Sequence, residues 1–218
     1  MSRSRRGQGR DISADAAGPT PRARLAPARA LALLFVMIAL AAASPVATVA
    51  AAPEQPAPAI GGHFTLVDQD GRTVTDATWR GKWLLVYFGY THCPDACPMA
   101  LNTMAAALDR LDAETRARVQ PVFVTVDPAR DTPAVMKSYV GAFEGAGIAG
   151  LSGTQEQVTA IETAYRIHVQ RHDDGDDEYS LDHTAVIHIM DPSGRFVGLV
   201  SDLMPPERLA DRLAQLLK

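Results

Sequence analysis

The sequence predicts a three-layer α/β domain with a central mixed sheet, preceded by an N-terminal membrane anchor. From residue 60 onward, short apolar runs alternate with segments of helical periodicity, which is typical of a sheet covered by helices. Before them come a basic stretch and a long uncharged apolar run. The chain has only two cysteines, four positions apart, where an apolar run gives way to a helical segment.

Residues 1–52 differ in composition from the rest of the chain. They hold seven of the 21 basic residues but only two of the 25 acidic residues. The apolar run that follows Arg29 is about 20 residues long, which is enough to cross a bilayer. We therefore predict a basic cytoplasmic leader at 1–29 and a transmembrane anchor at 30–52, with the C-terminal domain outside the cytoplasm. A cleaved signal segment at 30–52 is the alternative.

The remaining 166 residues contain 14 basic and 23 acidic side chains, so their formal charge is −9. This charge argues against nucleic-acid binding, which depends on clustered Lys and Arg side chains. The length suits a single domain with a sizeable core. We predict a Pro-rich, semi-rigid linker at 53–59 and one domain at 60–218.

The first half of the domain is predicted to contain a hairpin, a buried strand and a helix. Apolar and polar residues alternate on both sides of a turn at 68–71, which indicates a hairpin of 63–67 with 72–75. The run Trp83–Tyr87 is short and continuously apolar, as in a strand buried on both faces. Apolar residues then recur at helical spacing over 99–111.

The two cysteines lie at the junction of that strand and that helix. Pro98 directly precedes the helical segment, and proline is tolerated in the first turn of a helix but not in its interior. We therefore predict Cys97 at the N-cap and Cys93 in the preceding loop. Because the partial positive charge at a helix N-terminus favours a thiolate, Cys97 is predicted to be more acidic than a free cysteine.

The second half continues the alternation. We predict a strand at 119–126, helices at 133–143 and 154–165, a short strand at 167–170, an acidic loop at 173–178, a hairpin of 183–190 with 196–201, and a closing helix at 206–217. Asp127 is followed by a proline and is predicted to begin a turn. Elements in this order, with cysteines at the first strand-to-helix junction, indicate a thioredoxin-like fold.

Two cysteines at this spacing can meet each other or share a metal ion. Two thiolates are soft donors, which suit Cu(I) or, less selectively, Zn(II). A structural zinc site usually has four protein ligands, often with further cysteines, and this chain has none to add. The pair therefore favours copper bound by two sulfurs and one nitrogen. An inert buried pair and a stabilising disulfide are the alternatives, although closing so short a loop stabilises little.

Three motifs follow one another along the domain: GYTHCPDACP at 89–98, VDPARDTP at 126–133 and LDHT at 181–184. Together they resemble the Sco/SenC family, membrane-anchored copper chaperones that help to assemble cytochrome c oxidase. The resemblance extends from about residue 60 to the C-terminus. It implies a thioredoxin fold in which Cys93, Cys97 and His183 bind a copper ion, as Cu(I), Cu(II) or both.

Of the six histidines, His183 is singled out by this resemblance and by its place at the start of a predicted strand. In thioredoxin-like oxidoreductases a cis-proline commonly precedes that strand, so a donor at this place favours metal binding over disulfide exchange. We expect Asp182 to accept a hydrogen bond from the imidazole and orient it. His188 is predicted to be structural, and Met99 and Met104 are predicted to lie in the core.

These predictions describe a copper metallochaperone whose affinity is gated by the redox state of its CxxxC pair, since a disulfide removes both sulfur donors. A thiol–disulfide oxidoreductase that keeps the acceptor cysteines reduced and a redox-sensing domain are the alternatives. The expected partners are the copper-centre subunit of cytochrome c oxidase, other copper chaperones or a thioredoxin-like reductant, and the membrane through the anchor. We expect the inner (cytoplasmic) membrane, with the domain facing the periplasm, rather than the mitochondrial inner membrane.

Overall fold

The computed structural model describes residues 59–143, 145–175 and 178–218. The predicted leader and anchor, and the predicted linker up to residue 58, lie outside the described residues. Within the described ranges, no helix combines the length and the apolar character needed to cross a membrane.

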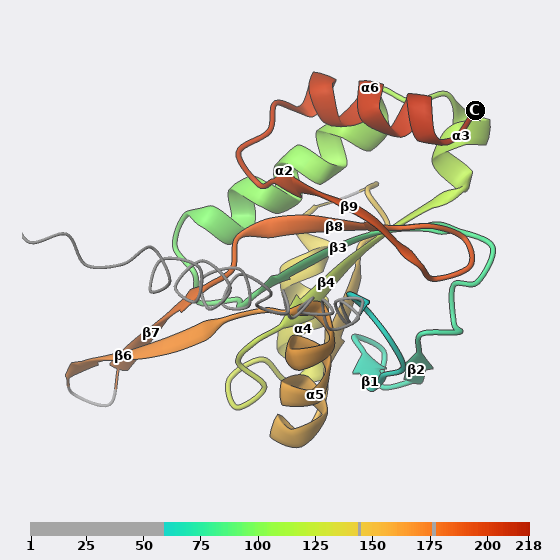
Figure 1. The fold of residues 1–218 in the computed structure, drawn as a ribbon. Coiled ribbons are helices and arrows are strands. Elements are labelled where there is room, and N and C mark those ends of the chain that lie inside the picture. Colours follow the sequence, from blue (N-terminus) through green and yellow to red (C-terminus); the bar gives the residue numbers. More distant parts are fainter. Residues whose placement is uncertain (1–58, 144, 176–177) are drawn as a thin grey trace, which may run out of the picture. The chain divides into compact units, whose positions relative to one another are not determined.

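A seven-stranded mixed sheet forms the centre of the domain (Figure 1). Its strands, in spatial order, are β2 (Thr73–Thr75), β1 (Thr65–Asp68), β5 (Ala149–Ser152), β4 (Val119–Thr125), β3 (Trp83–Gly89), β8 (Val186–Met190) and β9 (Phe196–Ser201). The inner strands β3, β4 and β5 run parallel, and the other pairs are antiparallel. The structure confirms the predicted mixed sheet and the first hairpin, which β1 and β2 form, whereas β5 was not predicted.

Helices cover both faces of this sheet. They are α2 (Ala96–Asp109), α3 (Ala113–Ala117), α4 (Pro133–Gly141), α5 (Gln155–Tyr165) and α6 (Pro206–Leu216). In Figure 1, α2 and α6 pack side by side on one face, and α4 and α5 lie on the other. Thr132 and Thr154 cap α4 and α5 by accepting backbone N–H groups, and each cap contributes about 1 kcal/mol. The three predicted layers are therefore present, and among the described helices the short α3 was not predicted.

Coverage on both faces explains why β3 is continuously apolar and why β4 is apolar over residues 121–124. Leu85 and Phe88 lie on opposite faces of β3 and are both fully buried, as is Phe123 in β4. Burying a side chain of this size contributes about 1.5–3 kcal/mol. The central strands thus form a closely packed base, and the cysteine loop extends from the end of β3.

A second hairpin projects from the sheet (Figure 1). β6 (Val169–Gly175) and β7 (Glu178–His183) form their own two-stranded antiparallel sheet. The predicted acidic loop at 173–178 is therefore wrong in part, because both of its ends belong to these strands. The short strand predicted at 167–170 covers only the start of β6. The rest of β6 is polar and shows no apolar alternation, and the alternation of Tyr179 and Leu181 with polar residues in β7 is short.

The predicted strand at 183–190 is two elements. β7 ends at His183, and β8 begins three residues later at Val186. Between them, the backbone N–H of Thr184 donates to the carbonyl of His168 (3.0 Å). His183 therefore lies at the base of the projecting hairpin rather than at the start of a central strand.

Candidate metal centre

Cys93 and Cys97 lie on the loop after β3 and in the first turn of α2. The N-cap of α2 is Asp95, so the predicted N-cap position of Cys97 is wrong by two residues. Because the first four N–H groups of a helix have no intrahelical partner, Pro98 fits equally well as the third helical residue. The backbone N–H of Cys97 donates to the sulfur of Cys93 (3.3 Å). Both cysteines are free; Cys97 is buried, and Cys93 is partly exposed.

Gly89 makes room for the buried sulfur. A Cβ atom at this position would lie 2.5 Å from Sγ of Cys97 and 2.9 Å from Cε2 of Phe123. Both separations are shorter than van der Waals contact, so any other residue at the end of β3 would displace the sulfur or the ring. The sequence shows Gly89 as the first residue of a motif, but only the packing shows what it does.

His183 approaches this sulfur from a part of the chain 86 residues away. Its Nε2 lies 3.5 Å from Sγ of Cys97, and its Nδ1 lies 3.2 Å from the carbonyl oxygen of Thr184. Because a carbonyl oxygen only accepts hydrogen bonds, Nδ1 is the protonated nitrogen and the lone pair of Nε2 faces the cysteine. The rings of Tyr87 and Tyr90 meet the imidazole edge-on, with centroids 6.0 and 6.2 Å away.

The two thiols are not equivalent. The thiol of Cys97 donates to Cys93 and lowers the pKa of Cys93 to about 4, helped by backbone N–H groups and partly opposed by burial. The pKa of Cys97 is raised, because it supplies that hydrogen bond and is itself buried. The prediction that Cys97 is the acidic cysteine is therefore wrong: the N–H groups at the start of α2 point to the sulfur of Cys93 instead.

A surface cavity of about 280 Å³ opens at these groups. Cys93, His183, Tyr90 and Leu181 are among its lining residues. A ligand or a partner's side chain that enters from solvent therefore meets the sulfur of Cys93 and the imidazole, while Cys97 lies deeper.

Three other sequence predictions have clear outcomes. Asp182 does not orient His183: its side chain is 81% exposed and contacts His172 (2.9 Å), and the carbonyl of Thr184 takes the expected role. The structural role of His188 is confirmed, because the ring is buried and its Nε2 contacts the carbonyl of Tyr165 (3.1 Å). Of the two methionines, Met104 is buried as predicted, but Met99 is 51% exposed.

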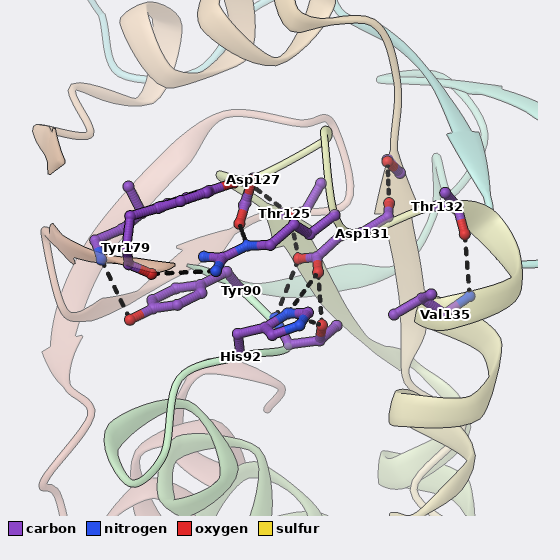
Figure 2. Close-up of polar contacts among 12 residues, drawn as sticks. Tyr90, His92, Thr125, Asp127, Asp131, Thr132, Val135 and Tyr179 are labelled. Carbon is purple, nitrogen blue, oxygen red and sulfur yellow. Dashed lines mark hydrogen bonds and ion pairs between the residues drawn. The ribbon is translucent and has the colours of Figure 1, made fainter. Parts of the chain in front are cut away.

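A buried carboxylate within the second motif, Asp131, holds the cysteine loop in place (Figure 2). Asp131 is fully buried and accepts hydrogen bonds from the backbone N–H (3.1 Å) and hydroxyl (2.6 Å) of Thr91. It also accepts one from the hydroxyl of Thr125 at the end of β4 (2.5 Å). The predicted turn at Asp127 is confirmed, since its carbonyl accepts from the N–H of Asp131 (2.9 Å). Together these contacts join the cysteine loop to the end of the neighbouring strand.

The donor types fit a soft metal ion, although the ligands are not yet arranged around one. Within 59–143, 145–175 and 178–218, no three His, Cys, Asp or Glu side chains are gathered closely enough to hold a metal. Two sulfurs and an imidazole nitrogen with a free lone pair are nevertheless the donors that Cu(I) prefers. Binding a metal through Cys93, Cys97 and His183 would therefore require the cysteine loop or the hairpin to move.

Fold and site together define a thioredoxin-like domain with a reactive cysteine pair beside a histidine. Residues 52–218 match the model of the SCO1/SenC family, and the chain belongs to this family. It is 43% identical to SenC of Rhodobacter capsulatus over 152 residues, which make up 70% of this chain and 68% of that protein.

Similar proteins come from bacteria and from mitochondria. The structure of Bradyrhizobium japonicum ScoI with copper bound is 41% identical, has a TM-score of 0.67, and covers 72% of this chain and 99% of that one. The mitochondrial SCO1 homolog 1 of Arabidopsis thaliana is 41% identical over 139 residues, 64% of this chain and 41% of that protein. The chain spans about half the length of the mitochondrial relatives that it matches.

Proposed function

We propose that this chain binds one copper ion through Cys93, Cys97 and His183 and delivers it to the copper centre of cytochrome c oxidase. The observation that carries the proposal is the imidazole Nε2, 3.5 Å from the sulfur of Cys97 with its other nitrogen engaged by Thr184. Among similar proteins, the structure of ScoI with copper bound supports copper as the metal. The resemblance to the Sco/SenC family supports cytochrome c oxidase as the acceptor.

The two cysteines have different protonation states before copper binds. Cys93 is already a thiolate at neutral pH, because its pKa is lowered to about 4. Metal binding therefore displaces the proton of Cys97 alone. Because Cys93 and His183 are partly exposed at the cavity, a donor chaperone or the acceptor subunit can exchange ligands with them.

Oxidation would end binding. Joining the two sulfurs in a disulfide removes two electrons and the Cys97 proton and leaves His183 as the sole remaining ligand. A thioredoxin-like reductant would restore the two thiols and with them the affinity for copper. Redox state thus gates capture and release.

Copper titration of the reduced full-length chain in detergent tests this function. We expect one copper per wild-type chain, no stoichiometric binding by the Cys93→Ser/Cys97→Ser double variant, and weaker binding by His183→Ala. His63→Ala is the matched control, because that ring is 97% exposed and contacts Asp76. Stoichiometric binding that survives in the double serine variant, with circular dichroism showing an intact fold, would exclude the site.

A second function, thiol–disulfide reduction of the acceptor, is favoured by the low pKa of Cys93. Its thiolate would attack the substrate disulfide, and Cys97 would then resolve the mixed disulfide. This leaves a Cys93–Cys97 disulfide and two reduced thiols on the substrate, with two electrons transferred. Metal-free chain mixed with a disulfide peptide tests it: we expect Cys97→Ser to accumulate the mixed disulfide and Cys93→Ser to be inactive. If wild type leaves the peptide oxidised, this function is excluded.

We also infer that 30–52 anchors the chain in the inner membrane with the domain facing the periplasm. The basic leader supports this orientation, and the similarity to SenC supports a bacterial setting. Protease added to spheroplasts of a bacterium that expresses the chain should digest the domain, while the anchored leader stays in the membrane fraction. A soluble product that begins near residue 53 would instead show cleavage.

A further inference from the structure

The hairpin that carries His183 has no strand partner in the central sheet among the described strands. In its register, Asp173 pairs with Tyr179 and Val169 with His183. Because side chains alternate along a strand, Tyr179, Leu181 and His183 share one face of β7. Whatever holds the first two of these residues therefore also determines where the imidazole lies.

Arg130 holds Tyr179 through three groups. Its Nη1 donates to the carbonyl of Tyr179 (3.1 Å), and its guanidinium carbon lies 3.5 Å from the centroid of the Tyr179 ring. Its Nε donates to Asp127 (2.5 Å), which also accepts from the hydroxyl of Tyr179 (2.7 Å). Figure 2 shows Tyr179 and Asp127 side by side at this point. The hairpin is thus fastened to the turn that follows β4.

The same guanidinium reaches toward the cysteine loop. Its carbon lies 5.8 Å from the ring of Tyr90, the residue that follows β3. The hydroxyl of Tyr90 accepts from the backbone N–H of Leu181 (3.3 Å), and its ring meets His183 edge-on. Arg130 and Asp127 are 19% and 4% exposed, so water weakens their ion pair little. We call Arg130, Asp127, Tyr179 and Tyr90 the Arg130 clamp.

We propose that Arg130 is a positioning residue of the metal centre: through the clamp, it sets the place of His183 relative to the two sulfurs. The inference rests on the proposed function, because its consequence is the nitrogen ligand. When the clamp is broken, the hairpin moves and the imidazole leaves the site, while Cys93 stays in the loop after β3 and Cys97 in the first turn of α2. Copper then keeps its sulfur ligands and loses its nitrogen ligand.

A double-mutant cycle on the full-length chain tests the copper side of this proposal. We expect Arg130→Gln to weaken copper affinity roughly tenfold or more, as removal of a group that orients a ligand does. In a His183→Ala background the same change should have no further effect. Arg130→Lys should restore part of the affinity because it keeps the charge but not the planar fork. An equal loss in both backgrounds, or no loss in either, overturns the proposal.

Arg171→Gln is the matched control. Its guanidinium carbon also lies close to the ring of Tyr179 (3.6 Å), but its side chain is 55% exposed and pairs with Asp173 on the hairpin itself. It therefore makes the same kind of stacking contact without joining the hairpin to the rest of the domain. Its replacement should leave copper affinity unchanged; a loss equal to that of Arg130→Gln would contradict the clamp.

A measurement without copper separates this inference from the proposed function. In the reduced, metal-free chain, Arg130→Gln should speed hydrogen exchange of the Leu181 amide and shift the imidazole resonances of His183, but not those of buried His188. Tyr179→Phe removes only one hydroxyl, so it tests the clamp even if Arg130→Gln does not fold. It should produce a smaller effect of the same kind. Unchanged exchange at Leu181 overturns the clamp even if copper binds, and a wild type that binds no copper refutes the proposed function alone.

Discussion

The two regions that meet at the candidate metal centre are built in different ways. The cysteine loop extends from β3, which is buried on both faces, and is joined to β4 by the buried carboxylate of Asp131. His183 lies instead on a polar hairpin that is held by a few contacts around Arg130. A site made of one closely packed part and one lightly attached part can adjust its ligands without disturbing the core.

The largest effect is expected in the packed region, from Gly89→Ala. The new methyl group would lie 2.5 Å from the sulfur of Cys97 and 2.9 Å from the Phe123 ring, so the chain should lose about 1–3 kcal/mol of unfolding free energy, as overpacked cores do. Copper affinity should fall as well, because the sulfur is displaced. Denaturant unfolding and copper titration measure the two effects.

Gly198→Ala in β9 is the control for this substitution. A Cβ at Gly198 meets no atom within 4 Å, so stability should change by no more than about 0.5 kcal/mol. Equal losses at the two glycines would show that crowding of the sulfur is not the cause.

The next effect is a pH dependence carried by the cysteine pair. The folded-state pKa of Cys93, about 4, lies below its unfolded value. The thiolate therefore stabilises the reduced fold fully above the unfolded pKa, and this contribution is lost as pH falls toward 4. The raised pKa of Cys97 acts in the opposite sense, and its contribution is lost as pH rises above the unfolded value.

We therefore expect the reduced, metal-free chain to gain unfolding free energy between pH 5 and pH 8, and Cys93→Ser to flatten that gain. Alkylation offers an independent measurement, because the thiolate is the reactive form. Cys93 should react at pH 6 almost as fast as at pH 8, whereas Cys97 should stay protected. A rate that keeps rising through pH 8 would mean that Cys93 is an ordinary thiol.

The smallest effect is expected on the outer face of the hairpin. His172 and Asp182 contact each other at 2.9 Å, but their side chains are 43% and 81% exposed. His172→Ala should therefore cost less than about 1 kcal/mol of stability and leave copper affinity unchanged. A clear loss of affinity would show that the hairpin responds to any substitution, which would weaken the contrast with Arg130.

Sequence patterns located the packed region well and the hairpin poorly. Continuous apolar runs indicate buried strands such as β3, because both faces of these strands are covered. β6 and β7 carry mostly polar side chains, so their pairing left no comparable signal. The roles of the residues that support the site were also hidden from the sequence. Gly89 and Arg130 lay inside recognisable motifs, but their partners, Cys97 and Tyr179, are eight and 49 positions away.

The sequence by itself predicted the layered α/β fold, the family and the three candidate ligands, because local periodicity and motif spacing carry that information. Only the tertiary structure decided which cysteine is charged, which nitrogen of His183 faces the sulfur, and what holds the hairpin against the loop. These properties depend on the direction and burial of hydrogen bonds between distant segments, and such contacts exist only once the chain has folded.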